Sequence, residues 1–125
     1  MRIVVIRGKG LAEQVAGALH RAGAEVVVID TEPGRESALA MAGLRAVRGD
    51  ALVLSTLEAA GALRADVLVA CTQSDKDNLV ISLLAKQRFN VSRVIARANE
   101  PTNDELSDHS WGSTRWSHRR QRLSR

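Results

Sequence analysis

The stretch that decides the fold is residues 2–30, RIVVIRGKGLAEQVAGALHRAGAEVVVID. It opens with a continuous apolar run over residues 2–7 and closes with another over residues 25–30, the pattern of strands buried on both faces. Between them, apolar residues recur at helical spacing over residues 11–22, and Gly23 follows as a helix-ending residue. A crossover of this length requires parallel pairing, so the stretch predicts a βαβ unit.

The same alternation continues to about residue 98. Further strands are expected at residues 44–47, 65–70 and 93–98, and further helices at residues 33–42, 52–60 and 78–89. Ser74, with Asp77 three residues later, is a capping-box signature ahead of the last helix. Five strand-helix units with right-handed crossovers predict an α/β fold, a single Rossmann-like domain with an open, doubly wound parallel sheet.

The composition agrees with one such domain. The chain has 125 residues, 45% of them hydrophobic but only 2% aromatic, so the core must be aliphatic. No apolar run approaches the roughly 20 residues of a spanning helix, and the start lacks the features of a signal peptide, which predicts a cytoplasmic protein. The single cysteine, Cys71, excludes an internal disulfide, and with three scattered histidines it does not form a metal-binding motif.

The charge is concentrated at the end of the chain. Residues 113–125 contain five arginines and no acid, whereas residues 1–112 contain 13 basic and 14 acidic groups, a net charge of −1. Binding to nucleic acid needs basic residues clustered on the folded body, and this pattern disfavours it.

A glycine loop follows the first strand, at the position where open α/β sheets bind ligands. It comprises Arg7, Gly8, Lys9, Gly10 and Leu11. Gly8 would allow a tight turn, and Gly10 would let the backbone approach a pyrophosphate at the N-terminus of the helix. Asp30 ends the second strand 20 residues later, the separation expected for a ribose-binding carboxylate, and it would repel a 2′-phosphate. The alternative is an ordinary strand-to-helix turn.

Glu13 departs from the dinucleotide-binding fingerprint, which has a glycine three residues after Gly10. A carboxylate in the first helical turn interacts favourably with the helix dipole but competes with phosphate for the same positive end. Two interpretations stay open: Glu13 faces solvent, or it blocks the site.

A series of short motifs identifies a family. They are Gly8-Lys9-Gly10, Val28-Ile29-Asp30, Arg48-Gly49-Asp50-Ala51, Ala70-Cys71-Thr72, Asp77-Asn78-Leu79, Ala96-Arg97-Ala98-Asn99 and Trp111-Gly112. In order and spacing, residues 1 to about 112 resemble the N-terminal NAD-binding domain of the Trk/Ktr potassium-uptake regulators, also called the RCK or KTN domain.

The resemblance implies a non-catalytic subunit that binds NAD(H) or ATP/ADP. It further implies a homodimer or a higher ring that controls a membrane potassium-translocating subunit, and a cytoplasmic protein peripheral to the inner face of the cell membrane when bound to it. Two other functions stay open: a nicotinamide-dependent oxidoreductase domain, which shares the fold, and a family member that no longer binds nucleotide.

The resemblance also implies roles for individual residues. Asp50 and Ala51 would flank the adenine, although Asp50 could instead cap the following helix. Thr72 and Gln73 would close the pocket. Arg97, at the end of the fifth strand, would supply positive charge to a phosphate or form a surface ion pair. Many members carry an arginine where this chain has Leu11, which removes one phosphate partner.

The chain divides into a nucleotide-binding domain, residues 1–112, and an irregular basic tail, residues 113–125. Because the tail has no apolar period, we hypothesise a shifted reading frame after residue 112; the alternative is a native tail that contacts a membrane surface or a partner. An aberrant tail would leave the strand at residues 93–98 as an unpaired sheet edge, which favours self-association. The aliphatic helix at residues 78–89 is the expected dimer surface.

Overall fold

The fold alternates strands and helices as the sequence predicts. The computed structural model describes residues 1–7 and 10–99 and the backbone of residues 114–116. The strands are β1 (Arg2–Ile6), β2 (Glu25–Asp30), β3 (Arg45–Arg48), β4 (Val67–Ala70), β5 (Arg93–Arg97) and β6 (Thr114–Trp116). The helices are α1 (Leu11–Arg21), α2 (Arg35–Met41), α3 (Leu54–Ala59), the short 3-10 helix η1 (Ala62–Arg64) and α4 (Asp75–Gln87).

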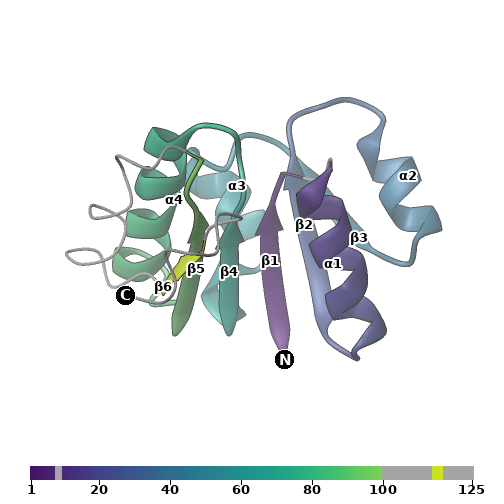
Figure 1. Cartoon of the computed structure of the whole chain (residues 1–125), viewed down its shortest axis with the longest axis horizontal. Coiled ribbons are helices and arrows are strands. Elements are labelled where there is room, and N and C mark those ends of the chain that lie inside the picture. The colour runs from purple at the N-terminus through teal and green to yellow at the C-terminus, as the bar shows by residue number, and fades with distance from the viewer. Residues whose placement is uncertain (8–9, 100–113, 117–125) are drawn as a thin grey trace.

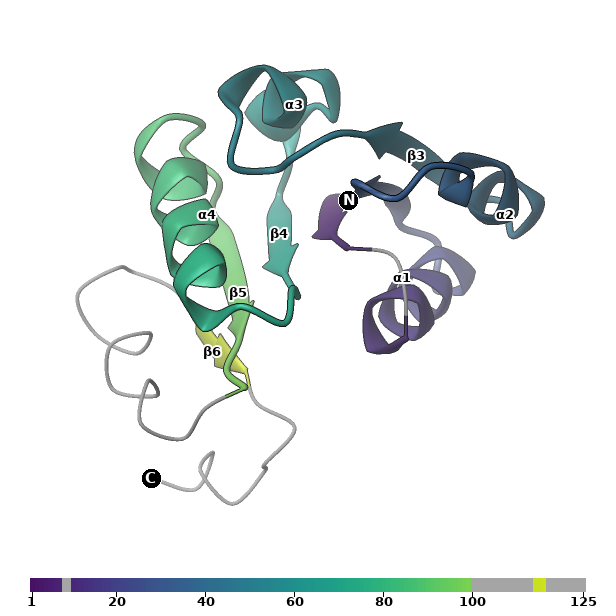
Figure 2. The ribbon, with the colours of Figure 1, turned by 90° about the horizontal axis from the view of Figure 1, so that it is seen from above.

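The strands form one parallel sheet in the order β3-β2-β1-β4-β5-β6 (Figure 1). The strand order reverses at β1, which pairs with β2 on one side and β4 on the other. Helices α1 and α2 cover one face of the sheet, and α3 and α4 cover the other (Figure 2). The predicted doubly wound α/β fold is confirmed, and its switch point lies at the end of β1.

The strands contribute alternate residues to two cores, as a sheet covered on both faces requires. On the α3/α4 face, Val4 and Ile6 of β1 pack with Leu57 of α3 and Ile81 of α4. On the opposite face, the intervening strand residues pack against Ala12 and Ala16 of α1 and Leu39 of α2. Burial of these aliphatic side chains, about 25 cal/mol per Å² of apolar surface, stabilises the fold.

Strand β6 corrects one expectation. It pairs with β5, placing Thr114 beside Ile95 and Trp116 beside Arg97. The predicted unpaired edge at residues 93–98 is therefore wrong, because strand pairing uses backbone groups and three residues without an apolar period can provide them. The rest of the predicted tail, residue 113 and residues 117–125, lies outside the described residues, and the reading-frame hypothesis stays a prediction.

The predicted capping box is half formed. Ser74 caps α4, and its Oγ accepts a hydrogen bond from the Asp77 N–H at 3.1 Å. The Ser74 N–H donates to Thr72 Oγ1 at 3.1 Å and not to the Asp77 carboxylate, which leaves that carboxylate available to the neighbouring cavity.

In the described part of the chain, no helix has the length and hydrophobicity needed to cross a bilayer.

Candidate functional site

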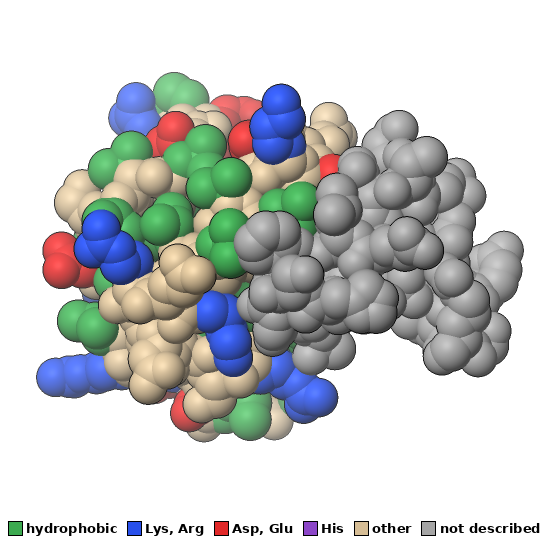
Figure 3. All heavy atoms as spheres, turned by 90° about the vertical axis from the view of Figure 1, so that its left-hand side faces the viewer, with side chains coloured by type: hydrophobic (Ala, Val, Ile, Leu, Met, Phe, Trp, Pro, Cys, Tyr) green, Lys and Arg blue, Asp and Glu red, His purple; other side chains and the backbone are tan. Residues whose placement is uncertain are grey.

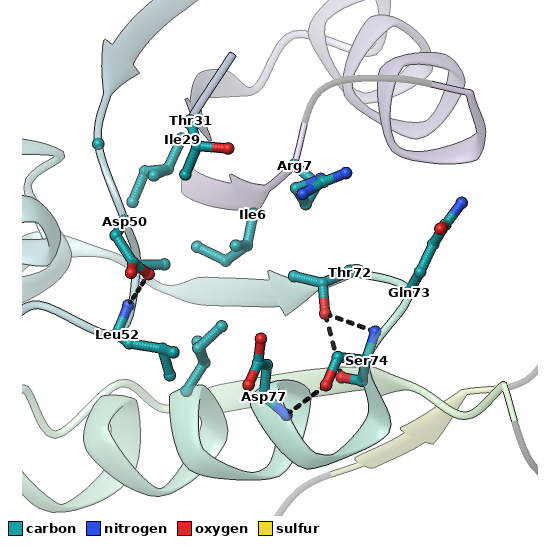
Figure 4. A pocket seen from close by; sticks show the side chains of 13 residues that line it. Ile6, Arg7, Ile29, Thr31, Asp50, Leu52, Thr72, Gln73, Ser74 and Asp77 are labelled. Carbon is teal, nitrogen blue, oxygen red and sulfur yellow. Dashed lines mark hydrogen bonds between the residues drawn. The ribbon is translucent and has the colours of Figure 1, made fainter.

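A cavity of about 410 Å³ lies at the switch point, between the carboxyl ends of the strands and the N-terminal half of α4 (Figure 4). It is lined by Ile6, Arg7, Ile29, Thr31, Gly49, Asp50, Ala51, Leu52, Thr72, Gln73, Ser74, Asp77 and Ile81. The isoleucines provide an apolar interior, and the polar residues come from the strand ends and the first turn of α4. This is the position at which open α/β sheets bind their ligands.

The glycine loop is described at both of its ends. Arg7 lines the cavity on the side opposite Asp77 (Figure 4), and its backbone is left-handed, with φ 80°. Its N–H donates to Ile29 O at 2.6 Å, which ties the start of the loop to the end of β2. Gly10 is the N-cap of α1 with φ 61°, and Leu11 is the first helical residue. The predicted roles of Gly8 and Lys9 fall outside the described residues.

Glu13 matches neither interpretation in full. Its side chain is 42% exposed, and its Oε1 pairs with Arg35 Nη2 at 2.9 Å. The helix residue that packs closely against the sheet is its neighbour Ala12, which is only 1% exposed. The small-residue contact of the fingerprint is therefore made one position earlier than the glycine spacing predicts.

Asp30 lies at the end of β2 but does not line the cavity. The side chain is 6% exposed; its Oδ1 accepts the Glu32 N–H at 3.0 Å, and its Oδ2 lies 3.8 Å from Arg35 Nε. Its backbone oxygen accepts the Gly49 N–H at 3.0 Å, which holds the turn after β3 against β2. The carboxylate is thus fixed beside the cavity on the side of α1 and α2.

Asp50 and Ala51 both line the cavity, as their predicted adenine role requires. The Asp50 carboxylate accepts the Leu52 N–H at 2.9 Å, a turn closed by the side chain of its first residue. The N-cap of α3 is Val53, without a side-chain hydrogen bond, so the alternative in which Asp50 caps that helix is wrong.

Asp77 was not predicted as a site residue. Its carboxylate points into the cavity from the first turn of α4, across from Ile6 and Arg7 (Figure 4). Asp50 and Asp77 together make the interior of the cavity acidic, with Arg7 as the lining cation among the described residues. Such an interior favours a ligand that presents hydrogen-bond donors to the carboxylates.

Thr72 and Gln73 line the cavity as expected, and a buried asparagine holds Thr72 in place. Asn78 is 1% exposed; its Oδ1 accepts from Thr72 N at 3.0 Å and from Thr72 Oγ1 at 2.7 Å. Its Nδ2 donates to Thr72 O at 3.1 Å and to Arg97 O at 3.0 Å, which joins the ends of β4 and β5. The signal for this role is a polar residue on the buried face of an apolar helix.

Arg97 does not line the cavity. Its side chain lies beside the thiol of Cys71, which is 3% exposed, and its buried Nε has no hydrogen-bond partner among the described residues. Burial raises the pKa of the Cys71 thiol above its ordinary value, and the Arg97 guanidinium opposes that rise in part. Because Arg97 lies beside Cys71 and does not line the cavity, its phosphate role stays a prediction. The described residues contain no cluster of three metal-ligating side chains.

The fold and the site define a class: a Rossmann-like domain with a polar cavity at the switch point of its sheet. Within that class, the TrkA-N domain model matches residues 3–112, and the chain belongs to this family. The Trk system potassium uptake protein TrkA of Mycobacterium tuberculosis H37Rv is 38% identical over 112 residues, which are 90% of this chain and 51% of that protein. The chain thus spans about half the length of that relative.

A second curated relative belongs to a potassium-efflux system, and solved structures share the fold. The glutathione-regulated potassium-efflux system protein KefC of Salmonella enteritidis PT4 is 36% identical over 98 residues, 78% of this chain and 16% of that protein. The TrkA-N domain of the Escherichia coli inner membrane protein YbaL superposes with a TM-score of 0.85 at 18% identity, over 98% of this chain and 91% of that one. The Shewanella denitrificans Kef C-terminal domain in its AMP-bound form gives 0.77 at 23% identity, over 93% and 72%.

Proposed function

We propose that this domain binds an adenine nucleotide, NAD(H) or ATP/ADP, in the cavity at the switch point. The observation that carries the proposal is the cavity itself, whose apolar walls, paired carboxylates and lining cation among the described residues suit an adenine base, its amino group and the phosphates. The AMP-bound form of the Kef domain, which has the same fold, adds support.

The base and the phosphates of the ligand each have matching groups. The base would lie between Ile6, Ile29 and Ile81, with its amino group toward the carboxylates of Asp50 and Asp77. The phosphates would lie near Arg7 and the N-terminus of α1, where backbone N–H groups and the helix dipole favour negative charge.

The proposed role is regulatory rather than catalytic. TrkA and KefC are proteins of potassium uptake and efflux systems, so we infer that nucleotide binding here controls a membrane potassium-translocating partner from the cytoplasmic side. A bound nucleotide can control the partner when it binds one conformation of the assembly more tightly than another. Turnover of NADH with any electron acceptor would contradict a non-catalytic role and favour the oxidoreductase alternative.

The proposed assembly is a homodimer or a larger ring joined through α4. Val80 on this helix is 40% exposed, and Leu79, Leu83 and Leu84 are only partly buried. Figure 3 views the molecule from the side of α4 and shows hydrophobic side chains between basic ones on this face. Burying such a surface against a second copy would remove apolar area from water.

A thermal-shift panel with NAD, NADH, ATP, ADP and AMP tests nucleotide binding. At 100 times its Kd, a bound nucleotide stabilises the folded state by about 2.7 kcal/mol, which raises the melting temperature measurably. Asp77→Ala, which removes a cavity carboxylate, should reduce this shift, whereas Lys76→Ala, at an exposed neighbouring position, should leave it unchanged. The absence of a shift with every nucleotide would favour a family member that no longer binds them.

A further inference from the structure

Three charged side chains from three elements meet at the first turn of α1, near the proposed position of the phosphates. Arg35, in the first turn of α2, lies between Glu13 of α1 and Asp30 of β2. Its Nη2 is 2.9 Å from Glu13 Oε1, and its Nε is 3.8 Å from Asp30 Oδ2. The exposed fraction of the side chain is 15% for Arg35 and 6% for Asp30, so water screens this ion pair weakly.

Glu13 lies in the first turn of α1, so the direction of its side chain decides whether its carboxylate lies at the positive end of that helix. Gly10 is the N-cap, and the Gln14 N–H donates to Gly10 O at 3.2 Å, so Glu13 is the third residue of the helix. In a capping box, a glutamate at that position turns back to the backbone N–H of the N-cap residue, a conformation that is also within reach of Glu13. In that conformation its carboxylate would occupy the positive end of α1, where a phosphate would bind. In this structure the carboxylate instead points to α2.

We propose that Arg35 is a positioning residue that keeps the N-terminus of α1 open to phosphate by holding Glu13 on the α2 side. The inference rests on the proposed nucleotide-binding function and extends it to residues that do not line the cavity. Asp30 holds the guanidinium from the other side, and the hydrogen bond between its Oδ1 and the Glu32 N–H keeps that carboxylate in place. The three charges sum to −1, and Arg35 shifts the negative charge of Glu13 away from the phosphates.

The test compares ADP with adenosine, which shares the base and ribose but has no phosphate. Titration calorimetry on the whole chain should show that Arg35→Met lowers ADP affinity on the order of tenfold, because the released Glu13 opposes the phosphates. Adenosine affinity should change much less. Adding Glu13→Gln to Arg35→Met should restore ADP affinity, and adding Glu36→Gln, which neutralises an exposed carboxylate on the same turn of α2, should not.

A single variant keeps the test decisive if Arg35→Met does not fold. Glu13→Gln alone should change ADP affinity less than about threefold, because the carboxylate is already held away from the phosphates; a rise of tenfold or more would show that Glu13 obstructs the wild-type site. Equal losses for ADP and adenosine in Arg35→Met, without rescue by Glu13→Gln, would overturn the positioning role alone. A wild-type chain that binds neither ADP nor adenosine would overturn the proposed function and this inference with it.

Discussion

The substitution Asn78→Ala tests how the cavity wall is held. The side chain of Asn78 makes four hydrogen bonds, three to Thr72 and one to Arg97 O, from a position that is 1% exposed. After substitution, Thr72 O still accepts from Asn99 Nδ2 at 3.1 Å, and Thr72 Oγ1 remains 3.1 Å from Ser74 O. The Thr72 N–H and the Arg97 carbonyl lose the side-chain partner that the structure gives them.

These two groups determine the magnitude. A buried polar group left without a partner costs about 1 to 3 kcal/mol, so the free energy of unfolding should fall by about 3 kcal/mol. For a domain of this size, that loss lowers the melting temperature by roughly 10 °C. Because Thr72 lines the cavity, the loss of its contacts with Asn78 should also weaken ADP binding.

Urea unfolding followed by circular dichroism measures the loss, and Gln87→Ala, at the exposed end of the same helix, is the matched control. The control should change stability by less than about 0.5 kcal/mol. If Asn78→Ala costs less than about 1 kcal/mol, the reasoning is refuted, because the orphaned groups would then have found partners elsewhere.

Four further predictions concern single side chains. Arg7→Gly should raise the free energy of unfolding by about 1 kcal/mol in urea titrations, because glycine adopts the left-handed backbone without strain, and should weaken ADP binding in calorimetry. Asp30→Ala should weaken the binding of adenosine as well as ADP by about 1.5 to 3 kcal/mol through lost ribose hydrogen bonds; unchanged adenosine affinity would reject that role. Because burial raises the pKa of the Cys71 thiol, its contribution to stability is present below the ordinary thiol pKa and is lost as the pH rises through the raised value. Iodoacetamide at pH 8 should accordingly label the native protein far more slowly than the urea-unfolded one, and equal rates would contradict the burial. Val80→Glu, at a 40% exposed position of α4, should convert the proposed dimer to monomer in sedimentation velocity, and an unaffected dimer would exclude this face.

The sequence was sufficient for the strands and for part of the cavity lining, because both depend on periodicity and strand ends. Residues 26–29 are apolar and buried, Asp30 is the buried polar residue at the strand end, and β2 spans Glu25–Asp30 as predicted. Asp50, Ala51, Thr72 and Gln73 follow strands whose carboxyl ends meet at one edge, so they come together in the cavity. Strand β6 had no such signal, since its pairing uses only backbone groups.

Side-chain contacts between different helices and strands could not be predicted from the sequence pattern. The ion pair of Glu13 with Arg35 joins residues 22 positions apart, and nothing local selects Arg35 over another arginine of the chain. Asp77 carried a local signal, but it indicated a reciprocal cap that the structure does not form, since the Ser74 N–H donates to Thr72. The Asp77 carboxylate lines the cavity because it does not accept a hydrogen bond from the Ser74 N–H.

The glycine loop shows how a motif and the backbone can differ by one position. A fingerprint loop needs a tight turn at its start and a small residue, five positions later, where the helix packs on the strand. Counted from Gly8, the small position is Glu13, which does not fit. Counted from Arg7, whose φ is 80°, it is Ala12, which is 1% exposed against the sheet. The backbone therefore satisfies the geometric requirement with an arginine in the turn, and Glu13 falls just outside the packed face, where Arg35 can reach it.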